Sequence, residues 1–178
     1  MRKIFVVNGR GGCGKTTFEK IVLKEIEGTM SPRVFHGKIL SMVDYVKDLA
    51  IEHLDWDGEK NLKSRKMLSG LKDVLTEWND SPYQEVKYYI NYIIKNYHNY
   101  CIFIDAREKA DIKRLVDEFG AKTILIKRDT GIEKYGNHAD DEVDSMEYDY
   151  TIWNTETLEN LENIAKTFAR TIVESLRF

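Results

Sequence analysis

The chain has 178 residues, a formal net charge of −3 and two cysteines. This length suits one domain with a buried core, and the weak negative charge gives no support for a general nucleic-acid or membrane surface. Two cysteines do not make a disulfide framework, so we expect a cytoplasmic protein. No apolar run approaches the roughly 18 residues of a membrane span, and the N-terminus enters an apolar run directly, so we expect neither a span nor a cleaved signal.

The most specific motif is G-x-x-x-x-G-K-[ST] at residues 9–16, the phosphate-binding loop of the P-loop nucleotide triphosphatases. The preceding residues 4–7, Ile-Phe-Val-Val, predict a buried strand. Apolar residues at helical spacing follow the motif, so we expect a helix that begins near Lys15. Strand, glycine loop and helix thus come in the order in which backbone N–H groups and a helix N-terminus surround a phosphate.

By the mechanics of this motif, Lys15 reaches the terminal phosphates of ATP and the Thr16 hydroxyl binds Mg²⁺. The cysteine within the loop either occupies a variable position of the motif, which we favour, or is a redox-sensitive thiol. The expected ATP-binding residues of this segment are Gly9, Arg10, Gly11, Gly12, Cys13, Gly14, Lys15, Thr16 and Thr17.

The rest of the chain alternates between apolar strands and amphipathic helices. Further strands are expected at 38–43, 100–104, 123–126 and 150–153, with helices between them and a last helix from about 158 to 176. Strands that are apolar on both faces predict an α/β fold, here the three-layer α/β/α P-loop fold with a five-stranded parallel sheet and a single domain over 1–178. Ligands are then expected at the carboxyl ends of the strands.

A long helical segment, about 44–98, separates the second and third strands. It is too long for one crossover helix and suggests a subdomain that covers a substrate. Within it, Ser81-Pro82-Tyr83-Gln84 resembles a helix capping box. Tyr89 and Tyr97 match the apolar face of the next helix, whereas Tyr88 and Tyr92 are expected to be exposed and are candidates for stacking on a base.

Asp105 directly follows the third strand, with Arg107 two residues later. A carboxylate at this place can hold Mg²⁺ beside Thr16, and an arginine can bind a phosphate through two hydrogen bonds. The alternative is that Asp105 caps the next helix and that Arg107 is solvated. We favour the functional interpretation, because a strand end beside a phosphate loop is where ligands bind.

Several segments together resemble the phage-type deoxynucleoside monophosphate kinases. The similar segments in the first half are residues 41–50 and Ser64-Arg65-Lys66-Met67-Leu68-Ser69. Those in the second half are Asp105-Ala106-Arg107-Glu108, residues 119–123, Arg128, His138 and Asp149-Tyr150-Thr151-Ile152-Trp153-Asn154, followed by Leu158 and Leu161. The similarity touches most of the chain, although only the phosphate loop is highly specific by itself.

The resemblance implies ATP- and Mg²⁺-dependent phosphoryl transfer to a nucleoside or deoxynucleoside monophosphate. It implies that Arg65 and Arg107 neutralise the acceptor monophosphate with help from Lys47, and that Asp105 organises Mg²⁺. It further implies that Arg128 opens a lid at about 129–149 and stabilises the transferring group, and that Asn154 and Thr155 border the adenine. The implied catalytic residues are Lys15, Asp105, Arg107 and Arg128, the expected partners are small nucleotides, and a homodimer is possible.

The expected lid departs from the family in its charge. Residues 129–149 contain Lys134 as their one lysine or arginine, against eight acidic residues. The lid therefore offers little positive charge to offset the negative charge of the phosphoryl group during transfer. Either Arg10, Arg107 and Arg128 suffice, or turnover is weak, or the acceptor is different. The alternatives are therefore a P-loop kinase of another metabolite, such as dephospho-coenzyme A, and a slow ATPase or nucleotide-binding regulatory protein. No N-K-x-D motif supports a GTPase.

Overall fold

The structure is a computed structural model that describes residues 1–30, 35–59, 61–128, 143, 146–155 and 157–174. The chain divides into a sheet unit, residues Met1–Ile39 with Ile93–Phe178, and a helical unit, Leu40–Tyr92. In chain order the elements are β1 (Arg2–Asn8), α1 (Lys15–Thr29), β2 (His36–Ser41), α2 (Asp44–His53), α3 (Leu62–Asn79), α4 (Ser81–Asn96), β3 (Tyr100–Asp105), α5 (Lys109–Phe119), β4 (Lys122–Lys127), β5 (Tyr150–Trp153) and α7 (Leu158–Glu174).

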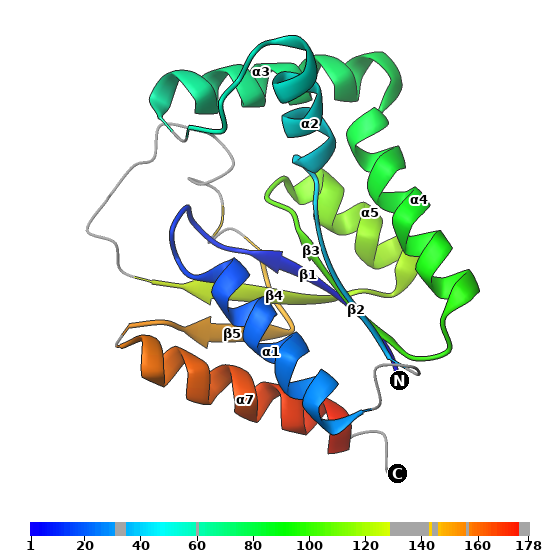
Figure 1. Cartoon of the computed structure of the whole chain (residues 1–178), viewed down its shortest axis with the longest axis vertical. Helices are drawn as coiled ribbons and strands as arrows, with labels where there is room; N and C mark the ends of the chain where they lie inside the picture. The colour runs from blue at the N-terminus through cyan, green and yellow to red at the C-terminus, as the bar shows by residue number, and fades with distance from the viewer. Residues whose placement is uncertain (31–34, 60, 129–142, 144–145, 156, 175–178) are drawn as a thin grey trace. The chain divides into compact units, whose positions relative to one another are not determined.

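Five strands of the described chain form one sheet in the order β2-β3-β1-β4-β5 (Figure 1). β1 pairs in parallel with β3 and β4, and β4 pairs in parallel with β5. Val7 lies opposite both Asp105 of β3 and Ile124 of β4. The carboxyl ends of β1 and β3 therefore meet at one edge of the sheet, where the loop after β1 begins. This architecture confirms the predicted P-loop fold with a parallel sheet.

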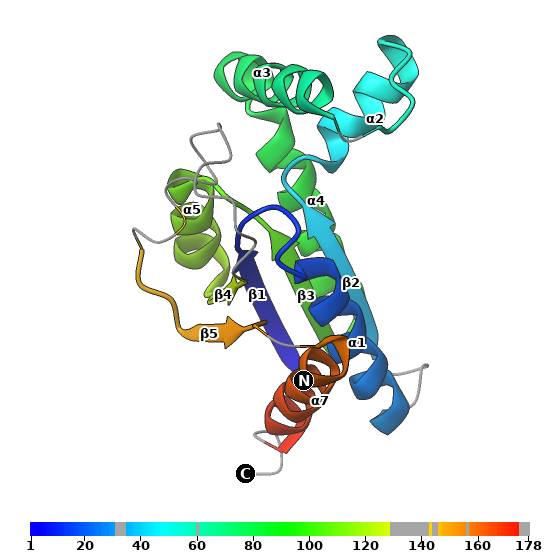
Figure 2. The same cartoon turned by 90° about the vertical axis from the view of Figure 1, so that its left-hand side faces the viewer.

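Side-chain alternation along the strands gives the sheet two apolar faces. Phe5, Val7 and Phe103 belong to the buried cluster that includes Phe18, Val22 and Ile26 of α1 and the apolar residues of α7. Alternate residues such as Ile102 and Ile104 are also fully buried and point to the opposite face, which α5 covers (Figure 2). Helices thus lie on both sides of the sheet, as predicted.

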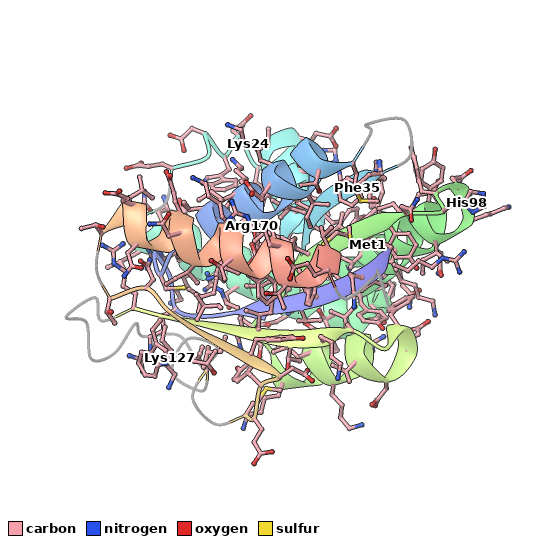
Figure 3. The ribbon with its side chains drawn as sticks, turned by 90° about the horizontal axis from the view of Figure 1, so that it is seen from below. Met1, Lys24, Phe35, His98, Lys127 and Arg170 are labelled. Carbon is pink, nitrogen blue, oxygen red and sulfur yellow. The ribbon has the colours of Figure 1, made fainter. Side chains whose placement is uncertain are left out.

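Helices α1 and α7 pack side by side, although they lie more than a hundred residues apart in the sequence. Phe168 of α7 packs against aromatic rings of β1 and α1. Its ring centroid lies 5.6 Å from that of Phe5 in β1 and 5.4 Å from that of Phe18 in α1. Figure 3 labels Arg170 on α7. Its Nε and Nη2 donate to Glu25 Oε1 of α1, both at 3.1 Å. The last helix therefore holds the helix that follows the phosphate loop.

The helical unit contains α2, α3 and most of α4. The Asn61 side chain caps α3 by accepting from Ser64 N at 2.8 Å, and Trp56 Nε1 donates to Ser64 Oγ at 3.1 Å. On α3 the large apolar residues Val74 and Trp78 are exposed, by 63% and 82%. Among the described residues, no helix is long and apolar enough to cross a membrane.

Two predictions for α4 are wrong. The capping box does not form, because the helix already begins at Ser81, whose hydroxyl has no hydrogen-bond partner in the described chain; Gln84 Nε2 instead donates to Asp80 Oδ2 at 3.2 Å. Tyr89 is 40% exposed rather than part of the core, because the buried stripe of α4 runs through Val86, Ile90 and Ile93. Tyr88 and Tyr92 are exposed as predicted.

Asp149 joins the start of β4 to the start of β5. Its Oδ2 accepts from Thr123 N and Oγ1 at 2.8 and 2.9 Å, and its Oδ1 accepts from Lys122 Nζ at 2.8 Å. Burial alone would raise the pKa of Asp149, but the hydrogen bonds from Lys122 and Thr123 outweigh it and lower that pKa. The carboxylate thereby fixes where the chain re-enters the sheet.

We expect Asp149→Ala to lower the free energy of unfolding by about 1 kcal/mol, because a backbone N–H and a hydroxyl lose their charged acceptor. Urea denaturation of the variant and the wild type measures the difference. Lys122→Ala is the matched control and should cost much less, because it removes an exposed ion pair alone. Equal losses in the two variants would contradict the role of the Thr123 hydrogen bonds.

Candidate functional site: the phosphate loop and the ends of β1 and β3

The loop between β1 and α1 depends on three glycines in backbone conformations that other residues rarely adopt. Gly9, Gly12 and Gly14 have φ angles of 148°, 79° and 101°. A Cβ on Gly9 would lie 2.5 Å from Ile126 O and 2.7 Å from Cys13 Sγ, and one on Gly14 would lie 2.7 Å from Asn154 Nδ2. All three glycines are therefore required by conformation, and Gly9 and Gly14 also by close packing around the loop.

Lys15 begins α1 and turns its side chain back over the loop. Its Nζ donates to Gly9 O at 2.7 Å and to Arg10 O at 3.2 Å. The ammonium group thus lies above the turn that the glycines form, where the motif requires a cation for the terminal phosphates. Thr16 and Thr17, the next two residues, are exposed at the helix N-terminus.

Buried amide side chains support the loop from below. Asn8, at the end of β1, accepts from Gly9 N through Oδ1 at 2.7 Å and donates through Nδ2 to Tyr148 Oη at 2.8 Å. Asn154, after β5, donates through Nδ2 to Cys13 O at 2.8 Å. The sequence motif did not indicate Asn8, because it lies one residue before the first glycine. That Asn154 and the exposed Thr155 also border an adenine stays a prediction.

The sheet brings Asp105 and Arg107 to the same place as the loop. Burial raises the pKa of the Cys13 thiol, and the charges of Lys15 and Arg107 oppose that rise whereas the charge of Asp105 adds to it. All three charges therefore act on one loop side chain. Asp105 is half-buried and Arg107 is exposed, so the geometry places a carboxylate inside and a guanidinium at the surface of this edge.

Glu19, one turn after Lys15, is a buried residue of this region that the sequence motifs did not indicate. Its side chain is fully buried, at 0% exposure, and neither carboxylate oxygen has a hydrogen-bond partner among the described residues. Burial, with the charge of Asp105 added to it, raises the pKa of Glu19 to about 8, against an opposing effect of Lys15. The sequence held one indication that Glu19 is buried. It lies three residues before Val22 and seven before Ile26, a helical spacing that places it on the same buried face of α1.

The residues at this edge suit a divalent cation. Thr16 offers a hydroxyl and Asp105 a carboxylate, both hard oxygen ligands of the kind that Mg²⁺ prefers. The two buried oxygens of Glu19 have no hydrogen-bond partner in the described chain. Unsatisfied buried oxygens are expected where a cation binds. Metal binding by Thr16 and Asp105 nevertheless stays a prediction, and no group of three or more His, Cys, Asp or Glu ligands occurs among the described residues.

The remaining predicted site residues belong to other elements. Lys47 and Arg65 belong to the helical unit, where Lys47 Nζ pairs with Asp44 Oδ1 at 2.9 Å and Arg65 is exposed on α3. Arg128 is exposed just after β4. The predicted lid, 129–149, falls largely outside the described residues, with 143 and 146–149 as its described part. The acceptor and lid roles of these residues stay predictions.

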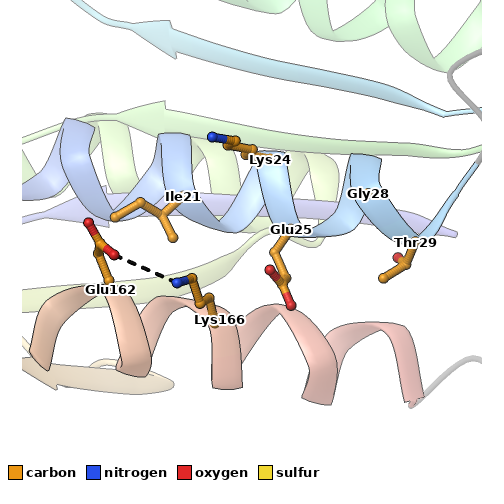
Figure 4. A pocket seen from close by; sticks show the side chains of 7 residues that line it. All are labelled: Ile21, Lys24, Glu25, Gly28, Thr29, Glu162 and Lys166. Carbon is orange, nitrogen blue, oxygen red and sulfur yellow. Dashed lines mark ion pairs between the residues drawn. The ribbon is translucent and has the colours of Figure 1, made fainter. Parts of the chain in front are cut away.

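A groove on the outer surface between α1 and α7 does not belong to this site. It is lined by Ile21, Lys24, Glu25, Gly28, Thr29, Glu162 and Lys166 (Figure 4). An ion pair of 3.6 Å between Lys166 Nζ and Glu162 Oε2 spans one turn of α7 within it. Because the groove contains no residue of the phosphate loop, it is a solvent-exposed space between two helices rather than part of the nucleotide site.

Comparisons with known proteins agree with the fold. No family model and no curated protein matches the sequence. Among solved structures, the protein APE1195 superposes with a TM-score of 0.51 at 12% identity, over 96% of each chain. Shikimate kinase from Bacteroides thetaiotaomicron gives 0.46 at 14% identity, over 97% of this chain and 98% of that one. The APS kinase CysC from Mycobacterium tuberculosis, in complex with AMPPNP and APS, gives 0.43 at 12%, over 99% and 98%. At 12% identity, the superposition on APE1195 shows the fold alone.

A pair of glycine substitutions tests the packing below the loop. Gly14→Ala places a methyl group 2.7 Å from Asn154 Nδ2 and 3.2 Å from Leu161 Cδ2, whereas a methyl group on Gly12 meets nothing within 4 Å. Both substitutions carry the strain of a positive φ, so the difference between them reports the clash. We expect Gly14→Ala to lose on the order of 1–2 kcal/mol more than Gly12→Ala in urea denaturation. Equal losses would contradict the clash with Asn154.

The buried Glu19 predicts a pH dependence of stability. Its folded-state pKa, about 8, lies above the ordinary value of 4.5, so the folded protein retains a proton that the unfolded chain releases. The stabilisation is complete below pH 4.5 and is lost as the pH rises through about 8. In EDTA, Tm of the wild type should therefore fall more steeply between pH 5.5 and 8.5 than Tm of Glu19→Gln. Parallel curves for the two proteins would exclude a raised pKa at Glu19.

Proposed function

We propose that the protein transfers the terminal phosphoryl group of ATP to a nucleoside or deoxynucleoside monophosphate. The observation that carries this proposal is the convergence of the phosphate loop with Asp105 and Arg107 at one edge of the sheet. A loop with Lys15 above it binds a phosphate chain, and a surface arginine beside it provides a second anion-binding group on the side from which an acceptor can approach. The resemblance of the sequence to phage-type monophosphate kinases supports the choice of acceptor.

Phosphoryl transfer needs positioning and charge compensation more than covalent chemistry from the protein. Backbone N–H groups of residues 9–14 and the start of α1 hold the phosphates of the donor, and Lys15 exchanges its carbonyl partners for phosphate oxygens. Mg²⁺, held by Thr16 and Asp105, would neutralise charge on the donor phosphates when bound. Arg107 orients the acceptor phosphate, and Arg65 and Lys47 of the helical unit contribute to the acceptor side.

A second candidate function is an ATPase whose turnover does not depend on an acceptor. It is favoured by the acidic composition of residues 129–149, which hold a single lysine and no arginine. Phosphoryl-transfer lids ordinarily bring positive charge to the transferring group. A kinase of another small metabolite remains the alternative within the same class of reaction.

An acceptor screen separates these functions. ADP release from ATP and Mg²⁺, coupled to an optical assay, is measured with each nucleoside and deoxynucleoside monophosphate in turn and with dephospho-coenzyme A. We expect one or a few monophosphates to raise ADP release at least tenfold above the rate without acceptor. A uniform rate across the panel would favour the ATPase, and stimulation by dephospho-coenzyme A alone would move the acceptor to another class of metabolite.

Arg107→Ala tests the acceptor side. We expect acceptor-dependent turnover to fall by 10²-fold or more, since one charged partner of the acceptor phosphate is lost, while the Kd of an ATP analogue changes by less than about threefold. Arg170→Ala, which removes a guanidinium bound to Glu25 on the outer face of α7, is the control and should leave both values unchanged. A comparable loss of ATP binding in Arg107→Ala would place this residue on the donor side instead.

A further inference from the structure

Glu19 is a charged side chain buried without a hydrogen-bond partner in the described part of the chain. Both of its side-chain oxygens are buried and make no hydrogen bond to the described residues. Burial of such unsatisfied oxygens costs free energy whether the carboxyl group is charged or protonated. A glutamate that served only to fill space on the buried face of α1 would be replaced by an apolar residue at lower cost. The position therefore calls for a group that the protein alone does not provide.

The place of Glu19 in the fold points to what that group is. It lies on the turn of α1 that follows Lys15 and Thr16, on the helix face that packs toward the sheet. Asp105, at the end of β3, is in register with Val7 and therefore projects from the same face of the sheet as Val7. The charges of Asp105 and Lys15 both act on Glu19, so the two carboxylates lie close enough to repel each other.

Lys15, the cation whose charge acts on Glu19, makes its hydrogen bonds to the loop instead. Lys15 Nζ donates to Gly9 O and Arg10 O, at 2.7 and 3.2 Å, and not to Glu19. When a nucleotide binds, the same ammonium group is drawn to phosphate oxygens, which leaves the charge of Glu19 with still less compensation. Two carboxylates and the Thr16 hydroxyl are hard oxygen donors, the ligand type of Mg²⁺ and Mn²⁺.

We propose that Glu19 is a second carboxylate of the divalent-cation site, acting with Asp105 and Thr16, and that it allows the cation to bind before the nucleotide arrives. This rests on the proposed function in so far as the cation is the one that accompanies ATP. A phosphate loop with a single carboxylate relies on the nucleotide for most of the ligands of its metal. A second, buried carboxylate raises the negative charge of the protein's own ligand set and makes binding without nucleotide favourable.

The test uses the full chain, Mn²⁺ as the probe and the amplitude of the free Mn²⁺ signal in electron paramagnetic resonance. Without nucleotide, we expect saturable Mn²⁺ binding to the wild type that weakens at least tenfold in Glu19→Gln, equivalent to about 1.4 kcal/mol. Glu27→Gln, which removes the same charge from an exposed position of α1, is the control and should bind as the wild type does. Circular dichroism in EDTA verifies that each variant is folded; if Glu19→Gln does not fold, Glu19→Met replaces it under the same criterion.

Two results would overturn the inference: no saturable binding of Mn²⁺ to the wild type without nucleotide, or equal affinities of the wild type and Glu19→Gln. In either case Glu19 carries a proton rather than facing a metal. The outcome is independent of the acceptor screen. If an acceptor stimulates ADP release but Glu19→Gln binds Mn²⁺ as the wild type does, only this inference fails. If Mn²⁺ binding depends on Glu19 but ADP release is the same with every acceptor, only the proposed kinase activity fails.

Discussion

A loop that binds phosphate must leave its N–H groups turned outward, and it therefore cannot hold its own shape by regular backbone hydrogen bonds. In this protein, side chains outside the loop help to hold its shape. Asn8 at the end of β1 accepts from the first glycine N–H, and Asn154 after β5 donates to the carbonyl of Cys13. Gly9 and Gly14 have positive φ angles and leave no room for a Cβ, which would meet Ile126 O at Gly9 and Asn154 Nδ2 at Gly14. The remainder of the site is built outward from this supported turn.

Electrostatics around the loop are arranged for ligands rather than for stability. A buried carboxylate at Glu19, the carboxylate of Asp105 and the ammonium group of Lys15 influence one another within a small region. Residues chosen for stability alone would be apolar at the Glu19 position, because burial of an unsatisfied charge costs more than a hydrophobic contact. Such local costs are typical of functional sites, where a bound ligand supplies the missing compensation.

Much of the fold was predictable from the sequence, because strand, glycine loop and helix follow local rules. The sheet, its helices on both faces and β5 at 150–153 followed from apolar periodicity. The exposure of Tyr89 did not, because successive helical residues are about 100° apart, so Tyr89, next to the buried Ile90, lies beside the buried stripe rather than within it. The early start of α4 did not either, because sequence patterns rarely fix the terminal residue of a helix. Glu19 escaped because a glutamate is taken as solvated unless the apolar stripe around it is followed strictly. Asn8 and Asn154 escaped as loop supports because they contact the motif in space, not in sequence.

The hydrogen bond from Asn154 to Cys13 joins residues that are 141 positions apart in the chain. The glycine motif is made early in synthesis. Asn154, whose side chain holds the carbonyl of Cys13, is made only after β5. Helix α7, which packs on α1, is made later still. A nascent chain that ends after β4 would carry the whole glycine motif without this support. The loop should thus reach its supported shape late in folding, once the segment after β5 is in place, which links the assembly of the loop to completion of the sheet.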